Sequence, residues 1–332
     1  MSANQLAEML ASCLAERFGQ AAEIVQLKPL TGGAASQTWA LEARCGGQQR
    51  SLILRAGDDE EQFENALLKP IEAELIAMLH RSGLPVPEVI ARTPAVAEVG
   101  AGFLMSRLPG EALPKRILNE PRLAQARQGL AAQCGQVLAA LHGIPVDSAT
   151  MLSGFDVEQD VLRYRARYRE FRQCLPVFDL AFYYLLEQLP RVREPAIVHG
   201  DFRNGNLLVD EGGLSGVLDW ELAHIGNPVE DLGWLCVNSW RFGNVDKPVG
   251  GFGDKETLLA AYNNAGGLDV QMDELNYWEI FGVLKWGVLC LYQSAIHLDG
   301  KQRSLERAVI GRRLSECEAD LAQLLIGQKP CR

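Results

Sequence analysis

The stretch IVHGDFRNGNLLVD places polar side chains that could do chemistry between two short apolar runs. Asp201 follows the run AIVHG, and Asn206 comes five residues later, directly before LLV. A further carboxylate, Asp219, ends the next apolar run, GVL. We expect residues on either side of 211–213 to pair as a hairpin, which would bring Asn206 near Asp219.

An amide oxygen and a carboxylate suit Mg²⁺, which takes oxygen ligands, often one or two protein groups together with phosphate oxygens and water. Asp201 would then accept a proton from a hydroxyl, or orient that hydroxyl, during phosphoryl transfer. The spacing therefore predicts magnesium-dependent phosphoryl transfer, with Asn206 and Asp219 as metal ligands and Asp201 as the base. Asp219 could instead cap a helix that begins at Trp220.

Two motifs in order, His199-Gly200-Asp201-x4-Asn206 and Leu218-Asp219-Trp220-Glu221, resemble the HGDxxxxN and DWE motifs of the aminoglycoside phosphotransferase and choline kinase superfamily. The resemblance extends over nearly the whole chain. The stretches PVPEV, MSRLPG and DWELAHIGNPVEDLGWL look most like the branch related to kinase domains joined to acyl-CoA dehydrogenases.

This resemblance implies that Asp201 is the catalytic base and that Asn206 and Asp219 bind Mg²⁺. It also implies that Glu221 helps to hold the metal, although a solvated position for Glu221 remains open. Two residues would have supporting roles: His199 would support the loop, and Asp231 would brace it rather than react.

The stretch Thr31-Gly-Gly-Ala-Ala-Ser36 resembles the loop that covers the ATP phosphates in this family, with Gly32, Gly33 and Ser36 as its binding residues. A simple hairpin turn is the alternative for Gly32 and Gly33. By the same resemblance, Met105 lies behind the adenine, and backbone groups of Ser106 and Leu108 face its hydrogen-bonding edge.

A kinase needs a strand cation paired with a helix carboxylate. The candidate cation is Arg55 in SLILRAG, where the family more often has lysine. Its partner would be Glu72 or Glu74. We prefer Glu72, because the residues three, four and seven positions later are apolar and share its helix face.

These residues need a sheet and several helices to position them. Short apolar pieces in residues 22–56 and the stretch AGFLMSRLPG predict antiparallel strands. Helical spacing predicts an amphipathic helix at the N-terminus and further helices over residues 66–82, 120–143, 158–193, 254–266, 272–298 and 303–326. We expect an α+β, protein-kinase-like two-lobed fold. Residues 1–108 would form a small nucleotide-binding lobe, and residues 109–332 a mainly helical lobe with the catalytic and metal motifs and the acceptor site.

The composition limits the partners. The net charge is −10 and the isoelectric point is near 5.1, which disfavours nucleic acid and an anionic membrane surface. No apolar run approaches the roughly 18 residues of a membrane span, and the N-terminus does not resemble a signal peptide. The eight cysteines include no CxxC pair, which indicates a cytoplasmic protein without a disulfide framework. The oligomeric state stays open.

The predicted function is transfer of the γ-phosphate of ATP, or of another nucleoside triphosphate, to a small-molecule hydroxyl with Mg²⁺. The acceptor could be a hydroxy acid or hydroxyacyl-CoA, an aminoglycoside or an amino alcohol. The alternatives are a non-catalytic nucleotide-binding module, a protein kinase and a metal hydrolase. Two further features are left open: tryptophans such as Trp234 and Trp240 could pack the core or line an acceptor pocket, and residues 241–254 could form an acceptor-side loop or a simple connection.

Overall fold

The computed structural model describes residues 3–30, 37–57, 66–96, 99–266, 268–301 and 303–327. The chain divides into two parts, which we call unit 1 and unit 2. Unit 1 contains Met1–Ala112 and Asn206–Ala223, whereas unit 2 contains Leu113–Gly205 and His224–Arg332. Residues 206–223 therefore group with the N-terminal part of the chain. The lobe boundary at residues 108 and 109 stays a prediction.

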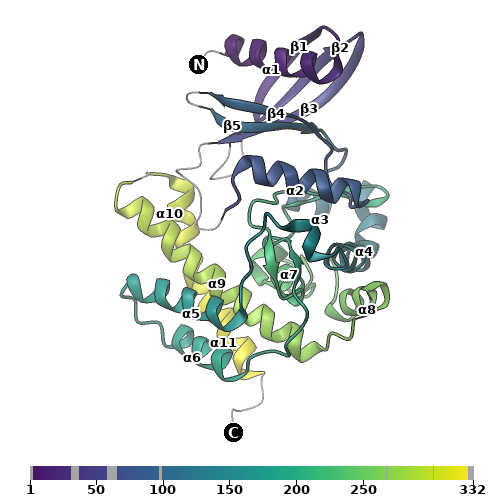
Figure 1. The fold of residues 1–332 in the computed structure, drawn as a ribbon. Helices are drawn as coiled ribbons and strands as arrows, with labels where there is room; N and C mark the ends of the chain where they lie inside the picture. The colour runs from purple at the N-terminus through teal and green to yellow at the C-terminus, as the bar shows by residue number, and fades with distance from the viewer. Residues whose placement is uncertain are drawn as a thin grey trace. The chain divides into compact units, whose positions relative to one another are not determined.

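A five-stranded antiparallel sheet forms the centre of unit 1, with the strand order β1-β2-β3-β5-β4 (Figure 1). Its strands are β1 (Ala22–Leu30), β2 (Gln37–Cys45), β3 (Gln48–Gly57), β4 (Val89–Val96) and β5 (Gly100–Ser106). The prediction of antiparallel strands within residues 22–56 and over AGFLMSRLPG is confirmed.

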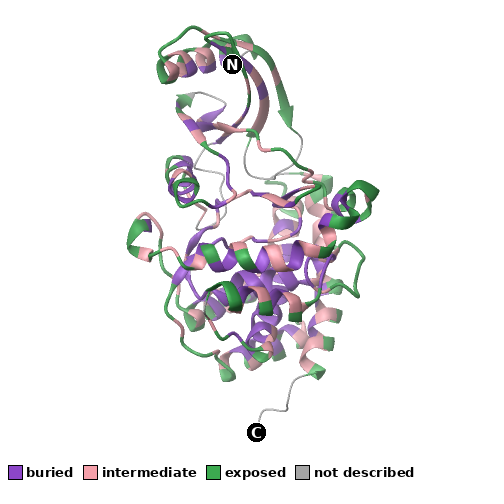
Figure 2. Ribbon diagram, turned by 90° about the vertical axis from the view of Figure 1, so that its right-hand side faces the viewer, coloured by how far each residue is buried: buried purple, intermediate pink, exposed green. Residues whose placement is uncertain are grey.

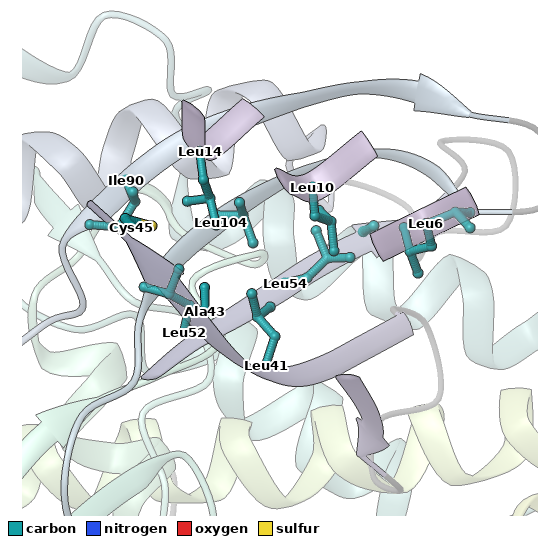
Figure 3. Packing of buried hydrophobic residues seen from close by; sticks show 12 residues of the cluster. Leu6, Leu10, Leu14, Leu41, Ala43, Cys45, Leu52, Leu54, Ile90 and Leu104 are labelled. Atoms are coloured by element: carbon teal, nitrogen blue, oxygen red, sulfur yellow. The ribbon is translucent and has the colours of Figure 1, made fainter. Parts of the chain in front are cut away.

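Helix α1 (Ala3–Phe18) covers one face of this sheet. Leu6, Leu10 and Leu14 recur every four residues and point toward sheet residues that include Leu54 (Figure 3). Side chains alternate between the two faces of a strand. Leu54 therefore joins this core, and its neighbour Arg55 lies on the opposite face of β3.

The remaining elements of unit 1 are helix α2 (Lys69–Arg81) and a hairpin of β7 (Leu207–Asp210) with β8 (Gly213–Val217). The hairpin pairs Leu207 with Val217, as the sequence predicted, and its turn is Glu211-Gly212. The Val217 amide donates to the carbonyl of Pro85 over 2.8 Å, which fixes the hairpin to the segment that follows α2.

Unit 2 is mainly helical, and its buried residues follow the inner faces of the helices (Figure 2). Its α-helices are α3 (Pro114–Asn119), α4 (Ala124–His142), α5 (Val157–Glu170), α6 (Pro176–Glu187), α7 (Val229–Cys236), α8 (Lys255–Gly266), α9 (Met272–Leu298), α10 (Leu305–Gly311) and α11 (Leu314–Ile326). The short 3-10 helices are η2 (Pro121–Leu123), η3 (Val146–Ala149) and η4 (Asn238–Arg241). Strands β6 (Ala196–Val198) and β9 (His224–Gly226) form an antiparallel pair.

Residues 158–193 and 303–326 were predicted to be helical, and each range contains two helices in the structure. Residues 158–193 divide because Arg172 has a left-handed φ of 51° and Pro176 starts a new helix. Residues 303–326 divide between α10 and α11. Helix α7 was not predicted from the sequence; it is only eight residues long, and all eight are buried.

Close packing of α7 on α9 depends on a glycine in α7. A Cβ atom at Gly233 would lie 2.4 Å from the Cβ of Trp278, so a larger residue would separate the two helices. None of the helices in the described ranges combines the length and the apolar character that a membrane crossing requires.

We expect Leu54→Ala to lower the free energy of unfolding by about 2–5 kcal/mol, because Leu54 is fully buried and its truncation leaves a cavity beneath α1. Urea denaturation followed by circular dichroism measures this loss. Val25→Ala is the control, since Val25 is 54% exposed and its truncation should change stability by about 0.5 kcal/mol or less. Equal losses in the two variants would contradict the proposed packing of α1 on the sheet.

Candidate active site

Arg55 is the centre of a charged cluster in unit 1. Its Nη2 atom lies 2.5 Å from Asp219 Oδ1 and 2.6 Å from Glu221 Oε2. Its Nε atom lies 2.9 Å from Glu72 Oε1, although the N–H is not aimed to form a hydrogen bond there. The structure thus pairs Arg55 with Glu72, the preferred of the two candidates. Glu74 lies exposed, 3.5 Å from Arg92.

Lys69 adds a second cation that the sequence analysis missed. Its Nζ atom lies 2.8 Å from Glu72 Oε2 and 3.2 Å from Glu221 Oε2, and its side chain is completely buried. A lysine at the start of a helix is normally exposed. The one available signal was its spacing of three residues from Glu72, within LLKPIEAEL. The cluster therefore has two cations, Arg55 and Lys69, and three carboxylates, those of Glu72, Asp219 and Glu221.

Electrostatic interactions keep Arg55 charged in this environment. Burial acts to lower the pKa of the Arg55 guanidinium, but Glu72, Asp219 and Glu221 together raise it above its ordinary value. Burial raises the pKa of the Glu72 carboxyl, although Arg55 and Lys69 act in the opposite direction. Both cations therefore favour the carboxylate form of Glu72 and offset part of the effect of its burial.

The predicted metal ligands Asn206 and Asp219 lie at the open end of the β7–β8 hairpin. The Leu218 amide donates to the Asn206 carbonyl over 2.8 Å, so residues 206 and 218 are direct neighbours. Asp219 follows with a left-handed φ of 69°, a conformation that non-glycine residues rarely adopt and that is found at functional sites. No helix begins at Trp220, so the helix-cap alternative for Asp219 was wrong.

The donor atoms of Asn206, Asp219 and Glu221 are oxygens, which fits the preference of Mg²⁺. Across the described ranges, no group of three His, Cys, Asp or Glu side chains could hold a metal ion by itself. Mg²⁺ commonly binds through one or two carboxylates and completes its shell with water and phosphate oxygens, so this small donor set agrees with such a site.

In unit 2, Asp231 fixes the backbone of the loop that carries Asp201. Its carboxylate accepts hydrogen bonds from the amides of His199, over 2.8 Å, and of Gly200, over 3.0 Å. The Nδ1 atom of His199 then accepts from the Asp201 amide over 3.1 Å. Both Asp231 and His199 are completely buried. Their contacts are those of residues that position the loop.

His142 and Tyr262 extend this network and were not selected from the sequence. The Nε2 atom of His142 lies 3.2 Å from Asp231 Oδ2, and its Nδ1 atom lies 2.8 Å from the Tyr262 hydroxyl. Burial raises the pKa of Tyr262, and the charge of Asp231 acts in the same direction. Helices α4 and α8, which carry His142 and Tyr262, therefore help to fix the orientation of Asp231.

Trp234 and Arg203 of unit 2 both contact the side chain of Asp201. The indole Nε1–H of Trp234 donates to Asp201 Oδ1 over 2.7 Å. The Nε–H of Arg203 lies 2.9 Å from Oδ1 and 3.1 Å from Oδ2. The sequence analysis left Trp234 as a core residue or part of an acceptor pocket, and it missed Arg203. Both side chains restrict the rotation of the Asp201 carboxylate.

The glycine-rich segment 241–254 has a structural role in unit 2. The Nδ2 atom of buried Asn204 donates to the carbonyl of Gly250 over 2.7 Å, which ties this segment to the loop of Asp201. Within the segment, Val249 and Gly253 form a bridge, and Asn244 donates to the Gly251 carbonyl over 3.1 Å. The segment is therefore a folded support for the loop and more than a simple connection.

The structure describes only some of the residues that were predicted to contact the nucleotide. Gly32, Gly33 and Ser36 lie outside the described residues. Met105 pairs with Ile53 and Val89 in the sheet. The Ser106 amide donates to the Glu88 carbonyl over 2.9 Å, so this N–H is used within unit 1, and Leu108 is half-buried after the end of β5.

Comparison with known proteins decides the family. Residues 26–268 match the model of a family described as the phosphotransferase enzyme family. The chain belongs to this family. The match confirms the resemblance identified from the HGDxxxxN and DWE motifs.

Among curated relatives, acyl-CoA dehydrogenase family member 10 of Mus musculus is 28% identical to this phosphotransferase family member over 201 residues. The match covers 57% of the chain and 18% of the relative, so the chain spans less than a fifth of that protein's length. This similarity confirms the expected relationship to the branch joined to acyl-CoA dehydrogenases.

Solved structures confirm the kinase-like α+β fold. A putative aminoglycoside phosphotransferase from Ralstonia eutropha superimposes with a TM-score of 0.77 at 20% identity, over 97% of this chain and 99% of the other. A spectinomycin phosphotransferase in complex with ADP and spectinomycin superimposes with a TM-score of 0.64 at 16% identity, over 97% and 99% of the two chains.

We expect Lys69→Met to lower the free energy of unfolding by about 3–5 kcal/mol, because it removes one of the two cations that compensate buried carboxylates. The loss should be smaller at low pH. The pKa of the Glu72 carboxyl is raised in the folded state, so as the pH falls Glu72 takes up a proton in the folded chain before it does so in the unfolded chain. The destabilisation caused by its buried charge is therefore present at high pH and disappears as the pH falls. Chemical denaturation at about pH 7 and about pH 5 measures both effects.

Arg92→Met is the matched control, since the ion pair of Arg92 with Glu74 is exposed and should contribute about 1 kcal/mol or less. If Lys69→Met were no more destabilising than this control, Lys69 would have no part in compensating the cluster.

Proposed function

We propose that this chain transfers the γ-phosphate of ATP, or of another nucleoside triphosphate, to a hydroxyl group of a small molecule. One observation carries the proposal: the Asp201 carboxylate is held by Trp234 and Arg203, on a loop whose backbone amides are fixed by buried Asp231. Because the chain belongs to a phosphotransferase family, we interpret the geometry around Asp201 as that of a site for phosphoryl transfer. Use of a nucleotide is supported by the ADP present in the spectinomycin phosphotransferase.

Asp201 orients the acceptor hydroxyl and takes its proton as the new bond to phosphorus forms. Arg55 contributes positive charge for the phosphates, and Glu72 and Lys69 hold it in place. Gly32, Gly33 and Ser36 would cover the phosphates, while Met105, Ser106 and Leu108 would contact the base. The positions of these six residues in nucleotide binding rest on the family resemblance.

Asn206 and Asp219 would hold Mg²⁺, with Glu221 as a further carboxylate. When bound, this ion would neutralise charge on the phosphate oxygens. Arg55 contacts both Asp219 and Glu221 in this structure, so either carboxylate would give up contacts with Arg55 in order to hold the metal. His199 and Asp231 support the loop and take no part in bond making.

We take a hydroxy acid or a hydroxyacyl-CoA, rather than an aminoglycoside, as the acceptor. A polycation needs carboxylates that are available to its ammonium groups. Three buried carboxylates of unit 2 instead have cation partners within 3 Å, namely Glu230 with Lys285, Glu279 with Arg241, and Glu274 with Arg193. The relationship to acyl-CoA dehydrogenase family proteins supports the same choice. The cytoplasmic location predicted from the cysteines agrees with such an acceptor.

We expect Asp201→Asn to reduce phosphoryl transfer by about 10²–10⁴-fold with little change in nucleotide affinity, because Asp201 acts on the hydroxyl. The test incubates a bacterial metabolite extract with the protein, ATP and Mg²⁺ and follows phosphorylated products by mass spectrometry. Calorimetry measures nucleotide binding in parallel. Asp210→Asn is a suitable control, because this carboxylate lies at the hairpin turn and its Oδ1 atom accepts from Gly212.

A product that forms with the intact chain but not with Asp201→Asn supports the proposal and names the acceptor. Equal product formation by both would exclude Asp201 as the base. Saturable nucleotide binding without any product would favour the alternative, a non-catalytic nucleotide-binding module in which Arg55 permanently occupies the predicted metal ligands.

A further inference from the structure

Arg203 is held in a fixed orientation beside Asp201. Its Nε–H interacts with both carboxylate oxygens of Asp201, and its guanidinium carbon lies 4.6 Å from the centre of the Trp240 ring. A guanidinium anchored by an ion pair and an aromatic face loses little further freedom when it binds a ligand. The side chain of Arg203 is 25% exposed, so part of it remains accessible to solvent.

The terminal nitrogens of Arg203 are available for a ligand. Within the described part of the chain, Nη1 and Nη2 have no hydrogen-bond partner; the bonds of Arg203 use Nε alone. The loop also leaves space for them. Gly205 has a φ of 120°, and a Cβ atom there would lie 2.6 Å from Nη1 of Arg203. A glycine at this position therefore keeps the guanidinium clear of the loop's own side chains.

The surroundings of Arg203 are rich in hydrogen-bond donors. Trp234 directs its N–H to Asp201, and the buried Nε1–H of Trp240 has no partner among the described residues. Lys285, whose ammonium group lies 5.4 Å from the centre of the Trp234 ring, is already paired with Glu230. The terminal N–H groups of Arg203 therefore remain as charged donors here, and charged donors suit an incoming group with several anionic oxygens.

We propose that Arg203 is a catalytic residue that binds the phosphoryl group during its transfer, an inference that rests on the proposed function. The acceptor oxygen forms a bond to the γ-phosphorus, and the bond from that phosphorus to the β–γ bridging oxygen breaks. The leaving nucleoside diphosphate keeps the electron pair, and the hydroxyl proton goes to Asp201. The terminal N–H groups of Arg203 donate to the phosphoryl oxygens as charge spreads over them.

Binding of a phosphoryl mimic tests this inference without knowledge of the acceptor. Calorimetry compares the affinity of the intact chain for Mg·ADP alone and for Mg·ADP with aluminium fluoride, which imitates the phosphoryl group in transfer. We expect aluminium fluoride to increase the affinity of the intact chain for Mg·ADP. In Arg203→Ala this increase in affinity should be about 10–100-fold smaller, as expected for the loss of charge-assisted hydrogen bonds. The affinity of Arg203→Ala for Mg·ADP alone should be unchanged.

Two variants separate phosphoryl binding from a structural role. Trp234→Phe removes the hydrogen bond from Trp234 to Asp201 and should lower turnover, yet it should keep the aluminium fluoride gain. Arg169→Ala removes an exposed arginine of α5 and should also keep the gain. Free guanidinium ion should restore part of the gain to Arg203→Ala, because it can occupy the space left beside Asp201 and Trp240.

The outcomes distinguish the two proposals. An intact chain that does not bind Mg·ADP at all would overturn the proposed function together with this inference. Normal Mg·ADP binding with the same aluminium fluoride gain in Arg203→Ala, or with no gain in the intact chain, would overturn the role of Arg203 and leave nucleotide binding standing.

Discussion

The ion cluster around Arg55 is the constraint on which the chemistry of unit 1 depends. One guanidinium contacts the carboxylates of Glu72, Asp219 and Glu221, and Lys69 supplies the second positive charge. Removing charges from water is costly, and their mutual attraction offsets that cost only when each has a partner. The strand β3, the helix α2 and the segment after β8 must therefore keep their positions together.

Unit 2 uses a different device to position Asp201. Its loop holds no regular secondary structure, so its amides need partners from elsewhere. Buried Asp231 accepts from two of these amides, and His142 and Tyr262 in turn fix Asp231. Asn204 adds a contact to the glycine-rich segment through the Gly250 carbonyl. The loop is thereby held at several points, and Asp201 can present its carboxylate with little reorganisation.

Much of the fold could be predicted from periodicity. Short apolar pieces identified the sheet strands, and the spacing of Glu72 relative to its apolar neighbours selected it over Glu74 as the partner of Arg55. The HGDxxxxN motif located the loop of Asp201. These features are local in the sequence, so a short window contains the information that specifies them.

Other features could not be predicted, because they depend on packing between distant segments. The spacing of Lys69 from Glu72 is the one local signal for it, and its other partner, Glu221, is 152 residues away in the sequence. His142 and Trp234 likewise act through contacts with Asp231 and Asp201, which only the fold brings to them. Helix α7 has only eight residues, too few for a helical period to be recognised in the sequence, and all of them are buried.

The most direct test of the account uses ATP whose terminal γ-phosphate oxygens carry oxygen-18. Mass spectrometry would follow the label after incubation of the intact chain with Mg²⁺ and a metabolite extract. The account predicts a phosphate ester that contains the labelled terminal oxygens and keeps the unlabelled oxygen of the acceptor, because the hydroxyl positioned by Asp201 attacks phosphorus. Label found only in inorganic phosphate, with every metabolite unmodified, would contradict transfer to a small-molecule hydroxyl.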